Sequence, residues 1–371
     1  MQKHFLAFLA FGCSFVLGAE HAEVKTLEIG AAAPDFSLPA VDGRAYSLRD
    51  FGSAKVLVII FTCNHCPTAR AYEDRIKSIV DDYKTKSVAV VAINPNDPQS
   101  VRLDELGYTD LSDSFAEMKT RAAYRKFNFP YLYDGETEAA SRKYGPVATP
   151  HAFVFDESRR LRYVGRIDDS ERLEYVHTHE LRDAIDALLA GREVAVKQTA
   201  SFGCSIKWKG KEDSVKRYLE KLAAEPVSVG TVDGQGLKAL RQNKTDKVIL
   251  VNFWATWCGP CVTEFPELIT INRMFRHRAF ELVTVAANYP DEEKEVLRFL
   301  KQQQASNRNL LFGTPEKYRL IEAFDPNWNG AIPYTLLLAP GGEVLYREQG
   351  SIDPLEIKRA IVKALKEDRF K

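Results

Sequence analysis

The sequence lacks three features that would place it at once in a functional class. Its 371 residues carry 51 basic and 51 acidic side chains, so no excess charge indicates a nucleic-acid partner or an acidic tail. The apolar stretch near its start, Phe5 to Leu17, is shorter than the ~20 residues that a membrane-spanning helix needs. Its 6 cysteines do not show the spacing of a four-cysteine zinc ribbon. The composition is that of an ordinary globular protein.

The first residues predict export. Lys3 precedes the apolar stretch, and Gly18 and Ala19 are small residues suited to a cleavage site. We therefore expect residues 1–19, with Cys13, to be a cleaved signal peptide. The protein would then work in the periplasm or another exported compartment, where disulfides persist. The alternative is an apolar first helix of the mature chain.

Apolar runs and breakers occur in the same order twice along the chain, and the length suits two domains. Strands alternating with helices, followed by a closing hairpin and helix, predict an α/β fold with a mixed sheet in each domain. We expect domains at 20–196 and 226–371, joined by a linker at 197–225 that contains an amphipathic helix. Strands are expected at 56–61, 88–93, 148–155, 161–165, 248–253, 282–287 and 331–338. Helices are expected at 67–83, 115–127, 136–144, 180–190, 212–224, 258–275, 291–304, 315–324 and 354–366.

Two cysteine pairs stand where a predicted strand turns into a helix. Unpaired N–H groups and the helix dipole at such a corner stabilise a thiolate. A second cysteine three positions on can close a disulfide, as thiol–disulfide exchange requires. The candidate redox pairs are Cys63 with Cys66 and Cys258 with Cys261, and we expect no metal or cofactor. The remaining Cys204 is a candidate third exchange thiol or a buried bystander.

The stretch "VNFWATWCGPCVTEFPEL" resembles the thioredoxin superfamily, and within it the exported TlpA/ResA/CcmG branch, over about residues 226–371. The resemblance implies a thioredoxin-like domain in which Cys258 attacks a substrate disulfide and Cys261 resolves the mixed disulfide. It also implies that Pro333, preceded by Ile332, is a cis-proline facing the pair.

Two neighbours of this pair extend the resemblance. Glu264 matches the acidic residue that tunes the pair in ResA-like proteins, and Asn252 stands where thioredoxin has a buried aspartate. A partly buried Glu264 would have a raised pKa and could exchange protons with the thiols. The alternative is a solvated helix charge. Trp257 is expected to form packing and docking surface.

The first half, about residues 25–195, resembles redoxin proteins of the AhpC/TSA type through "PDFSLPAVDGRAYSL" and "CNHCP". The resemblance implies a second thioredoxin-like domain with Thr149–Pro150 as its cis-proline. His65 lies within the pair, as in DsbA-like and isomerase-like sites, which implies that it stabilises the thiolate of Cys63 and raises the reduction potential. The alternative is an exposed loop histidine without effect.

These observations predict an exported thiol–disulfide oxidoreductase that acts on protein thiols and disulfides. The second pair would be reductase-like and the first of higher potential, with a membrane or soluble electron donor and with electron exchange between the domains left open. One alternative is a thiol peroxidase, an antioxidant whose second domain recycles the first. Against it, aligning Cys66 with a peroxidatic cysteine puts Cys63 and Ile59 where threonine and proline belong. Another is a non-enzymatic binding module stapled by disulfides.

Overall fold

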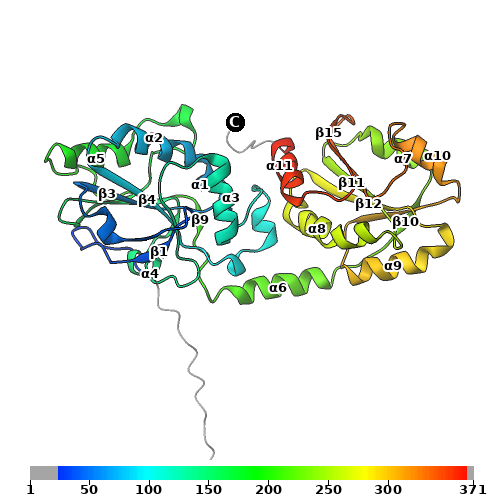
Figure 1. Ribbon diagram of the computed structural model, residues 1–371, viewed down its shortest axis with the longest axis horizontal. Coiled ribbons are helices and arrows are strands. Elements are labelled where there is room, and N and C mark those ends of the chain that lie inside the picture. The colour runs from blue at the N-terminus through cyan, green and yellow to red at the C-terminus, as the bar shows by residue number, and fades with distance from the viewer. Residues whose placement is uncertain (1–23, 366–371) are drawn as a thin grey trace, which may run out of the picture.

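The computed structural model describes residues 24–365, so the expected signal peptide and Cys13 lie outside the described residues. Figure 1 shows two lobes side by side, each built on a central sheet covered by helices, with helix α6 (Glu212–Ala223) running between them. The expected α/β class and the two mixed sheets are confirmed. No helix within residues 24–365 is long and apolar enough to cross a membrane.

The sheet of the first domain is centred on β3 (Val56–Phe61), which is buried along its whole length, as its continuous apolar run predicts. The strand order is β5-β4-β3-β7-β8. β3 is parallel to β4 and antiparallel to β7, which makes the sheet mixed. The other strands of this sheet are β4 (Val88–Asn94), β5 (Tyr131–Tyr133), β7 (His151–Phe155) and β8 (Leu161–Gly165).

Alternate side chains of β3 enter two apolar cores, one on each face of the sheet. Val58 and Ile60 pack beneath one group of helices: α2 (Glu73–Tyr83), α3 (Phe115–Arg125) and α5 (Glu180–Leu189). Ile59 and Phe61 pack on the other face. That face is covered by β1 (Ser37–Pro39), β2 (Ala45–Ser47), η1 (Leu48–Phe51) and α4 (Ser141–Tyr144).

The second domain repeats this plan around β11 (Val248–Trp254). Its strand order is β10-β13-β12-β11-β14-β15, with β11 parallel to β12 and antiparallel to β14. The other strands are β10 (Gly230–Val232), β12 (Phe280–Ala286), β13 (Arg308–Phe312), β14 (Tyr334–Leu338) and β15 (Val344–Gln349). One face packs on α8 (Gly259–Phe275), α9 (Glu293–Gln302) and α11 (Pro354–Ala364), and the other on α7 (Gly234–Gln242) and α10 (Lys317–Phe324).

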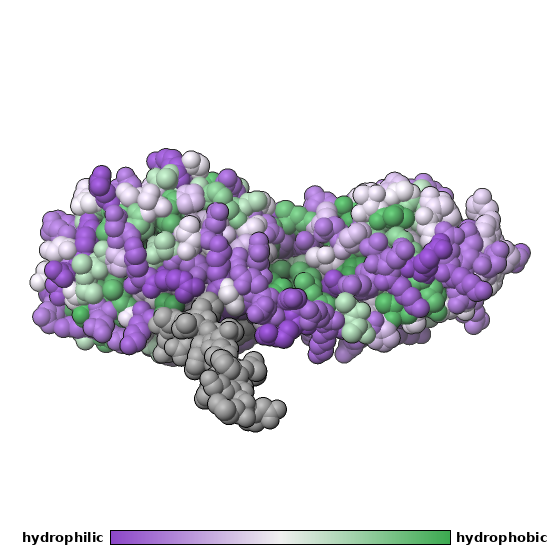
Figure 2. All heavy atoms as spheres, turned by 90° about the horizontal axis from the view of Figure 1, so that it is seen from below, coloured by the Kyte–Doolittle hydropathy of each residue, from purple (hydrophilic) through white to green (hydrophobic). Residues whose placement is uncertain are grey.

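The loop between β4 and α3 connects the two domains. Leu106, at the end of η3 (Leu103–Leu106), is buried in the apolar cluster of the second domain. At Gly107 a Cβ atom would come within 2.8 Å of the carbonyl oxygen of Met274 in α8, so the two backbones approach too closely for any other residue. Arg359 of α11 pairs with Asp110 at 3.1 Å. Figure 2 shows apolar side chains at the junction of the lobes on a face that is mostly hydrophilic.

Residues 197–209 were expected to form part of a polar linker. Instead they lie against the first domain, and we call this segment the strap. Its two-residue strand β9 (Cys204–Ser205) pairs antiparallel with β6 (Ala148–Thr149). The first domain therefore continues structurally past residue 196, and α6 is the part of the expected linker that runs between the lobes (Figure 1).

Other differences from the expected elements are local. The helix expected at 67–83 is divided at Tyr72 into α1 (Pro67–Ala71) and α2, and the helix expected at 136–144 shortens to α4. β1, β2, β5, β9, β10, β13 and α7 were not predicted, because they are short or lie in polar stretches. The remaining 3-10 helices are η2 (Pro98–Ser100), η4 (Leu173–Tyr175) and η5 (Pro290–Glu292).

Candidate redox sites

The second domain holds its cysteine pair at the corner between β11 and α8. Cys258 is the N-cap of α8, and its Sγ accepts a hydrogen bond from the Cys261 N–H at 3.3 Å. The two cysteines are joined by a disulfide with an S–S distance of 2.01 Å. Cys261 is fully buried and Cys258 is 6% exposed, so only the first cysteine reaches the surface. The β-strand run therefore delivers the pair to a helix N-terminus, as the sequence predicts.

The surroundings of Cys258 form an open surface. The Ile332–Pro333 peptide bond is cis, as predicted, and the Ile332 carbonyl oxygen lies 3.7 Å from Cys258 Sγ. Trp257 is 62% exposed, and the Lys317 ammonium lies 5.7 Å from its ring centroid. Within the described residues, no strand pairs with Ile332. This arrangement leaves a backbone edge and an exposed aromatic ring beside the disulfide.

Glu264 is buried, as the prediction of a partly buried helix acid requires. Its Oε1 accepts a hydrogen bond from Asn252 Nδ2 at 3.1 Å, and its Oε2 accepts one from the Ile352 N–H at 3.0 Å. Burial raises the pKa of Glu264 above its ordinary value, and the two hydrogen bonds offset only part of that rise. A proton is therefore held more tightly here than on an exposed glutamate.

The first domain places its pair at the matching corner, after β3. Cys66 is the N-cap of α1, and its Sγ accepts a hydrogen bond from the Ala69 N–H at 3.5 Å. Cys63 and Cys66 are thiols, 3% and 0% exposed. The Thr149–Pro150 peptide bond is cis, and the Thr149 hydroxyl lies 3.1 Å from Cys63 Sγ. Both pairs thus lie where a strand turns into a helix, but the helix cap is the second cysteine here and the first cysteine in the second domain, and Cys63 and Cys66 are both buried.

His65 is not the exposed loop histidine that the sequence left open, because it is 1% exposed. Its Nδ1 lies 2.5 Å from Asp113 Oδ2, and Asn96 Nδ2 donates to the same oxygen at 2.8 Å. Burial alone would lower the pKa of His65, but the charge of Asp113 outweighs it and raises the pKa. Asp113 therefore favours protonation of the buried imidazole, and sequence reasoning missed both Asp113 and Asn96.

The expectation that His65 stabilises the thiolate of Cys63 is corrected to Cys66. Burial raises the pKa of Cys63 well above its ordinary value, and the hydrogen bond with Cys66 and the charge of Asp113 add to the rise. Burial also opposes ionisation of Cys66, but hydrogen bonds from Cys204 and Cys63 and the charge of His65 outweigh it. They hold the pKa of Cys66 well below its ordinary value. Of the two cysteines, Cys66 is therefore the one whose thiolate form the site favours.

Cys63, His65 and Asp113 also form a buried group whose ligand atoms lie within 4.8 Å of one another, a spacing that a metal ion could bridge. Oδ1 of Asp113, however, accepts the Asn64 N–H at 2.7 Å and the His65 N–H at 3.2 Å, while Oδ2 faces the imidazole. The carboxylate therefore already has a full set of partners, and the geometry favours a role in orienting His65.

Cys204 lies in the strap, directly beside the first pair. Its N–H donates to Cys66 Sγ at 3.3 Å, and its side chain packs against the cluster formed by Cys63, Cys66 and Ala69. It is half-buried, so it is the most exposed of the three cysteines. The only sequence signal for this contact was that residue 204 is a cysteine. Nothing else in "FGCSIKW" indicates that the segment lies beside the first pair.

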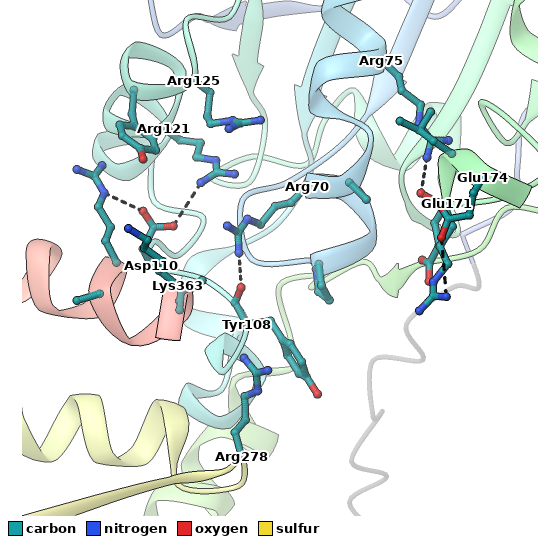
Figure 3. A pocket seen from close by; sticks show the side chains of 18 residues that line it. Arg70, Arg75, Tyr108, Asp110, Arg121, Arg125, Glu171, Glu174, Arg278 and Lys363 are labelled. Atoms are coloured by element: carbon teal, nitrogen blue, oxygen red, sulfur yellow. Dashed lines mark hydrogen bonds and ion pairs between the residues drawn. The ribbon is translucent and has the colours of Figure 1, made fainter. Parts of the chain in front are cut away.

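A separate cleft of about 690 Å³ lies between the domains (Figure 3). It is lined by side chains of both domains, among them Arg70, Tyr108, Asp110, Arg278 and Lys363. Figure 3 shows Arg70 directed at the Tyr108 carbonyl and Asp110 between arginines of the two domains. None of the site cysteines lines this cleft.

A strand that ends at a cysteine pair, a helix that begins there and a facing cis-proline together define the redox domain of thioredoxin-like proteins. Comparison with known families supports a thioredoxin-like domain in both halves of the chain. A model of the AhpC/TSA family matches residues 29–164, and a model of the Redoxin family matches residues 224–364. The chain therefore belongs to the thioredoxin superfamily, with two such domains in tandem.

Named relatives match part of the chain. The thiol:disulfide interchange protein CycY of Rhizobium leguminosarum bv. viciae is 32% identical over 126 residues, or 32% of this chain and 59% of CycY. The thiol-disulfide oxidoreductase ResA of Bacillus subtilis is 28% identical over 113 residues, or 30% of this chain and 59% of ResA. The chain thus spans well under two thirds of the length of these relatives.

Among solved structures, an uncharacterized conserved protein from Geobacillus kaustophilus is 38% identical, with a TM-score of 0.45. The match covers 52% of this chain and 99% of that protein. The strap, at residues 197–209, lies outside both ranges matched by the family models.

Proposed function

We propose that the chain is a thiol–disulfide oxidoreductase in which both cysteine pairs take part in exchange with protein thiols and disulfides. The observation that carries the proposal is the repeated corner, in which Cys66 and Cys258 each cap a helix next to a cis-proline. The helix N-terminus stabilises the thiolate that exchange requires. The names of the relatives CycY and ResA support the same activity.

In the second domain, Cys258 attacks a substrate disulfide and forms a mixed disulfide, which Cys261 resolves. The burial of Cys261 supports this order, because only Cys258 reaches the surface. Glu264 accepts and returns the proton at this pair, a role that its raised pKa favours. Trp257, Ile332 and Pro333 form the docking surface for the substrate chain.

In the first domain, Cys63 and Cys66 form a centre of higher reduction potential, beside Thr149 and Pro150. Interactions that stabilise the Cys66 thiolate favour the reduced form and thereby make the disulfide a stronger oxidant. Within this fold, reduction potentials span on the order of 150 mV, or ~7 kcal/mol for two electrons. The two pairs therefore have opposite biases, the second toward reducing its substrates.

The test is a separate measurement of the two reduction potentials. The full chain is prepared as Cys258→Ser/Cys261→Ser and as Cys63→Ser/Cys66→Ser, and each variant is equilibrated in glutathione buffers. The first variant, which keeps the first pair, is expected to have the higher potential. Equal potentials would contradict the proposed difference, and failure of both variants to exchange with a protein disulfide such as insulin would contradict the activity.

A second candidate is peroxide reduction by the first domain. The AhpC/TSA match and the lowered pKa of Cys66 favour it, since a thiolate is the form that attacks peroxide. Peroxide consumption that is lost in Cys66→Ser but retained in Cys258→Ser with an external thiol would support this candidate. Consumption that is equal in the two variants would exclude it.

The proposal also includes export of the protein and a source of electrons for the two pairs. Lys3, the apolar stretch and Ala19 support cleavage of a signal peptide, and N-terminal sequencing of the protein from cells tests it. The electron donor would be a membrane or soluble protein, and the two pairs could also exchange electrons with each other. If the chain is prepared with only the second pair reduced, such exchange would appear as a loss of the disulfide at the first pair.

A further inference from the structure

The strap is fastened to the first domain on both sides of Cys204. Before it, the Thr199 N–H donates to the Val164 carbonyl at 3.0 Å, next to a parallel bridge between Gln198 and Val164. After it, the Lys207 N–H donates to Asn96 Oδ1 at 2.9 Å, and the Lys207 ammonium pairs with Glu105. The position of Cys204 is therefore fixed by contacts at each end of the segment.

Between these anchors, the strap occupies the edge beside the cis-proline. Cys204 and Thr149 are antiparallel partners, and Thr149 directly precedes Pro150. At Gly203 a Cβ atom would come within 1.9 Å of the Thr149 carbonyl oxygen, and φ is +155°, so this close approach requires glycine. In the second domain the equivalent edge, at Ile332, is unpaired in the described chain. An extended substrate chain has no access to the first edge while the strap is in place.

The thiols of the first domain therefore form a row that runs from the interior to the surface. Cys63 is buried and contacts Cys66, Cys66 contacts the half-buried Cys204, and the Cys204 side chain hydrogen-bonds to Cys66. Cys66 stands in the middle and can pair with either neighbour. The buried pair is reached from outside through Cys204.

We propose that Cys204 is the relay cysteine of the first domain, which carries disulfide exchange between the buried Cys63–Cys66 pair and external protein thiols through a Cys66–Cys204 disulfide. This inference deepens the proposed function and rests on it. In this proposal the external partner is a protein dithiol, and it contacts the first domain at the strap.

The exchange balances without any other reactant. The Cys204 thiolate attacks Sγ of Cys66, the Cys63–Cys66 bond breaks, and the electron pair leaves on Cys63, which takes up the proton that Cys204 released. One disulfide is present before and after this step. A partner thiolate then attacks Sγ of Cys204 and Cys66 leaves. The partner's second thiol resolves the mixed disulfide, so the partner is oxidised and the Cys66–Cys204 disulfide is reduced.

Peptide mapping tests the relay directly. Trypsin places Cys63 and Cys66 in one peptide, residues 56–70, and Cys204 in another, residues 198–207. The full chain with Cys258→Ser/Cys261→Ser is oxidised in glutathione buffers, quenched with acid, alkylated and digested without reductant. We expect the two peptides to be cross-linked in part of the molecules, and in most of them when Cys63→Ser is added. Cys66→Ser should remove the cross-link.

The result that would overturn the relay is a 198–207 peptide that is alkylated or glutathionylated, and never cross-linked, at every buffer ratio. Since Cys63→Ser could disturb the buried site, Cys63→Ala is mapped as a second variant. Absence of the cross-link in the parent and in both variants rejects the proposal.

A kinetic readout separates the relay from the underlying activity. Oxidation of a reduced protein dithiol by the first domain should slow by about 10-fold or more in Cys204→Ser, because the thiolate that links the pair to the partner is gone. Ser205→Ala, the exposed neighbour in β9, is the matched control and should keep the parental rate. An active parent with an unchanged Cys204→Ser rate overturns the relay alone. An inactive parent contradicts the proposed function, while the cross-link still decides the relay.

Discussion

The two candidate redox sites both lie where a strand turns into a helix, but they differ in access. In the second domain, Cys258 lies beside an exposed Trp257 and an unpaired edge at Ile332, whereas in the first domain Cys63 and Cys66 are enclosed. The difference comes from the strap, which pairs with the first domain at the position where the second is open. Access at these sites is thus decided by a segment outside the repeated fold. The domain repeat alone does not determine which partners each pair meets.

The largest expected effect separates the sites by substrate. Cys258→Ser should lower the reduction of a large protein disulfide such as insulin by about 10³-fold or more, because the accessible nucleophile is lost. Cys66→Ser, at the enclosed pair, should leave insulin reduction nearly unchanged. Initial rates of insulin precipitation with dithiothreitol as reductant measure both. Equal losses in the two variants would show that insulin reduction requires the enclosed pair as much as the open one.

A substitution that pushes the strap away from Thr149 should open the first site. Gly203→Ala puts a methyl group against the Thr149 carbonyl, so the strap must shift, and the free energy of unfolding should fall by about 1–3 kcal/mol. Alkylation of Cys66 by iodoacetamide, followed by mass spectrometry, should become faster. Phe202→Ala, at an exposed side chain in the same strap, is the control that should not change it. Unaltered labelling in Gly203→Ala would mean that the strap does not limit access.

The charge beside the first pair should set its potential. Asp113→Asn removes the carboxylate that raises the pKa of His65, so less imidazolium remains to stabilise the Cys66 thiolate. The reduction potential of the first pair should fall by roughly 30 mV, which corresponds to ~1.4 kcal/mol for two electrons. Glutathione equilibration measures the shift. The second pair, measured in the same molecule, should keep its potential, and a parallel fall there would indicate a general structural effect.

The smallest expected effect concerns pH at the second site. Because the pKa of Glu264 is raised above the ordinary 4.5, the folded chain binds more protons than the unfolded chain once pH exceeds that value. The stabilising contribution is fully present below pH 4.5 and is lost as pH rises through the folded-state pKa, with a slope of less than one proton. Denaturant titrations of the parent and Glu264→Gln should show that the variant lacks this slope. Identical slopes would assign the dependence to other groups.

The sequence alone was sufficient to predict the features that depend on local pattern. The runs before Cys63 and Cys258 became central buried strands, both predicted prolines are cis, and Glu264 is buried at the expected turn of its helix. Each of these follows from residues within a few positions of one another or from the family motif. The domain plan followed because the same order of strands and helices occurs twice.

What the sequence could not predict depends on contacts between distant segments. Asp113 lies 48 positions from His65, on a loop without a regular pattern, so the sequence did not reveal that the site lowers the pKa of Cys66 and raises that of Cys63. Cys204 pairs across a strand of only two residues, which is too short for any periodicity. A segment that the sequence indicated to be a polar linker therefore lies against a candidate site.

The position of the strap has a practical consequence for dividing the protein. A fragment cut at residue 164, where the family match ends, or at residue 196, where the linker was expected, would keep the Cys63–Cys66 pair but lose Cys204 and its cover. Such a fragment would expose a backbone edge at Thr149 that is paired in the intact chain. Other molecules could then add a strand at this edge. Kinetics measured on it would describe a more permissive catalyst than the whole protein, so fragments of the first domain should extend through Lys209, the last residue of the strap.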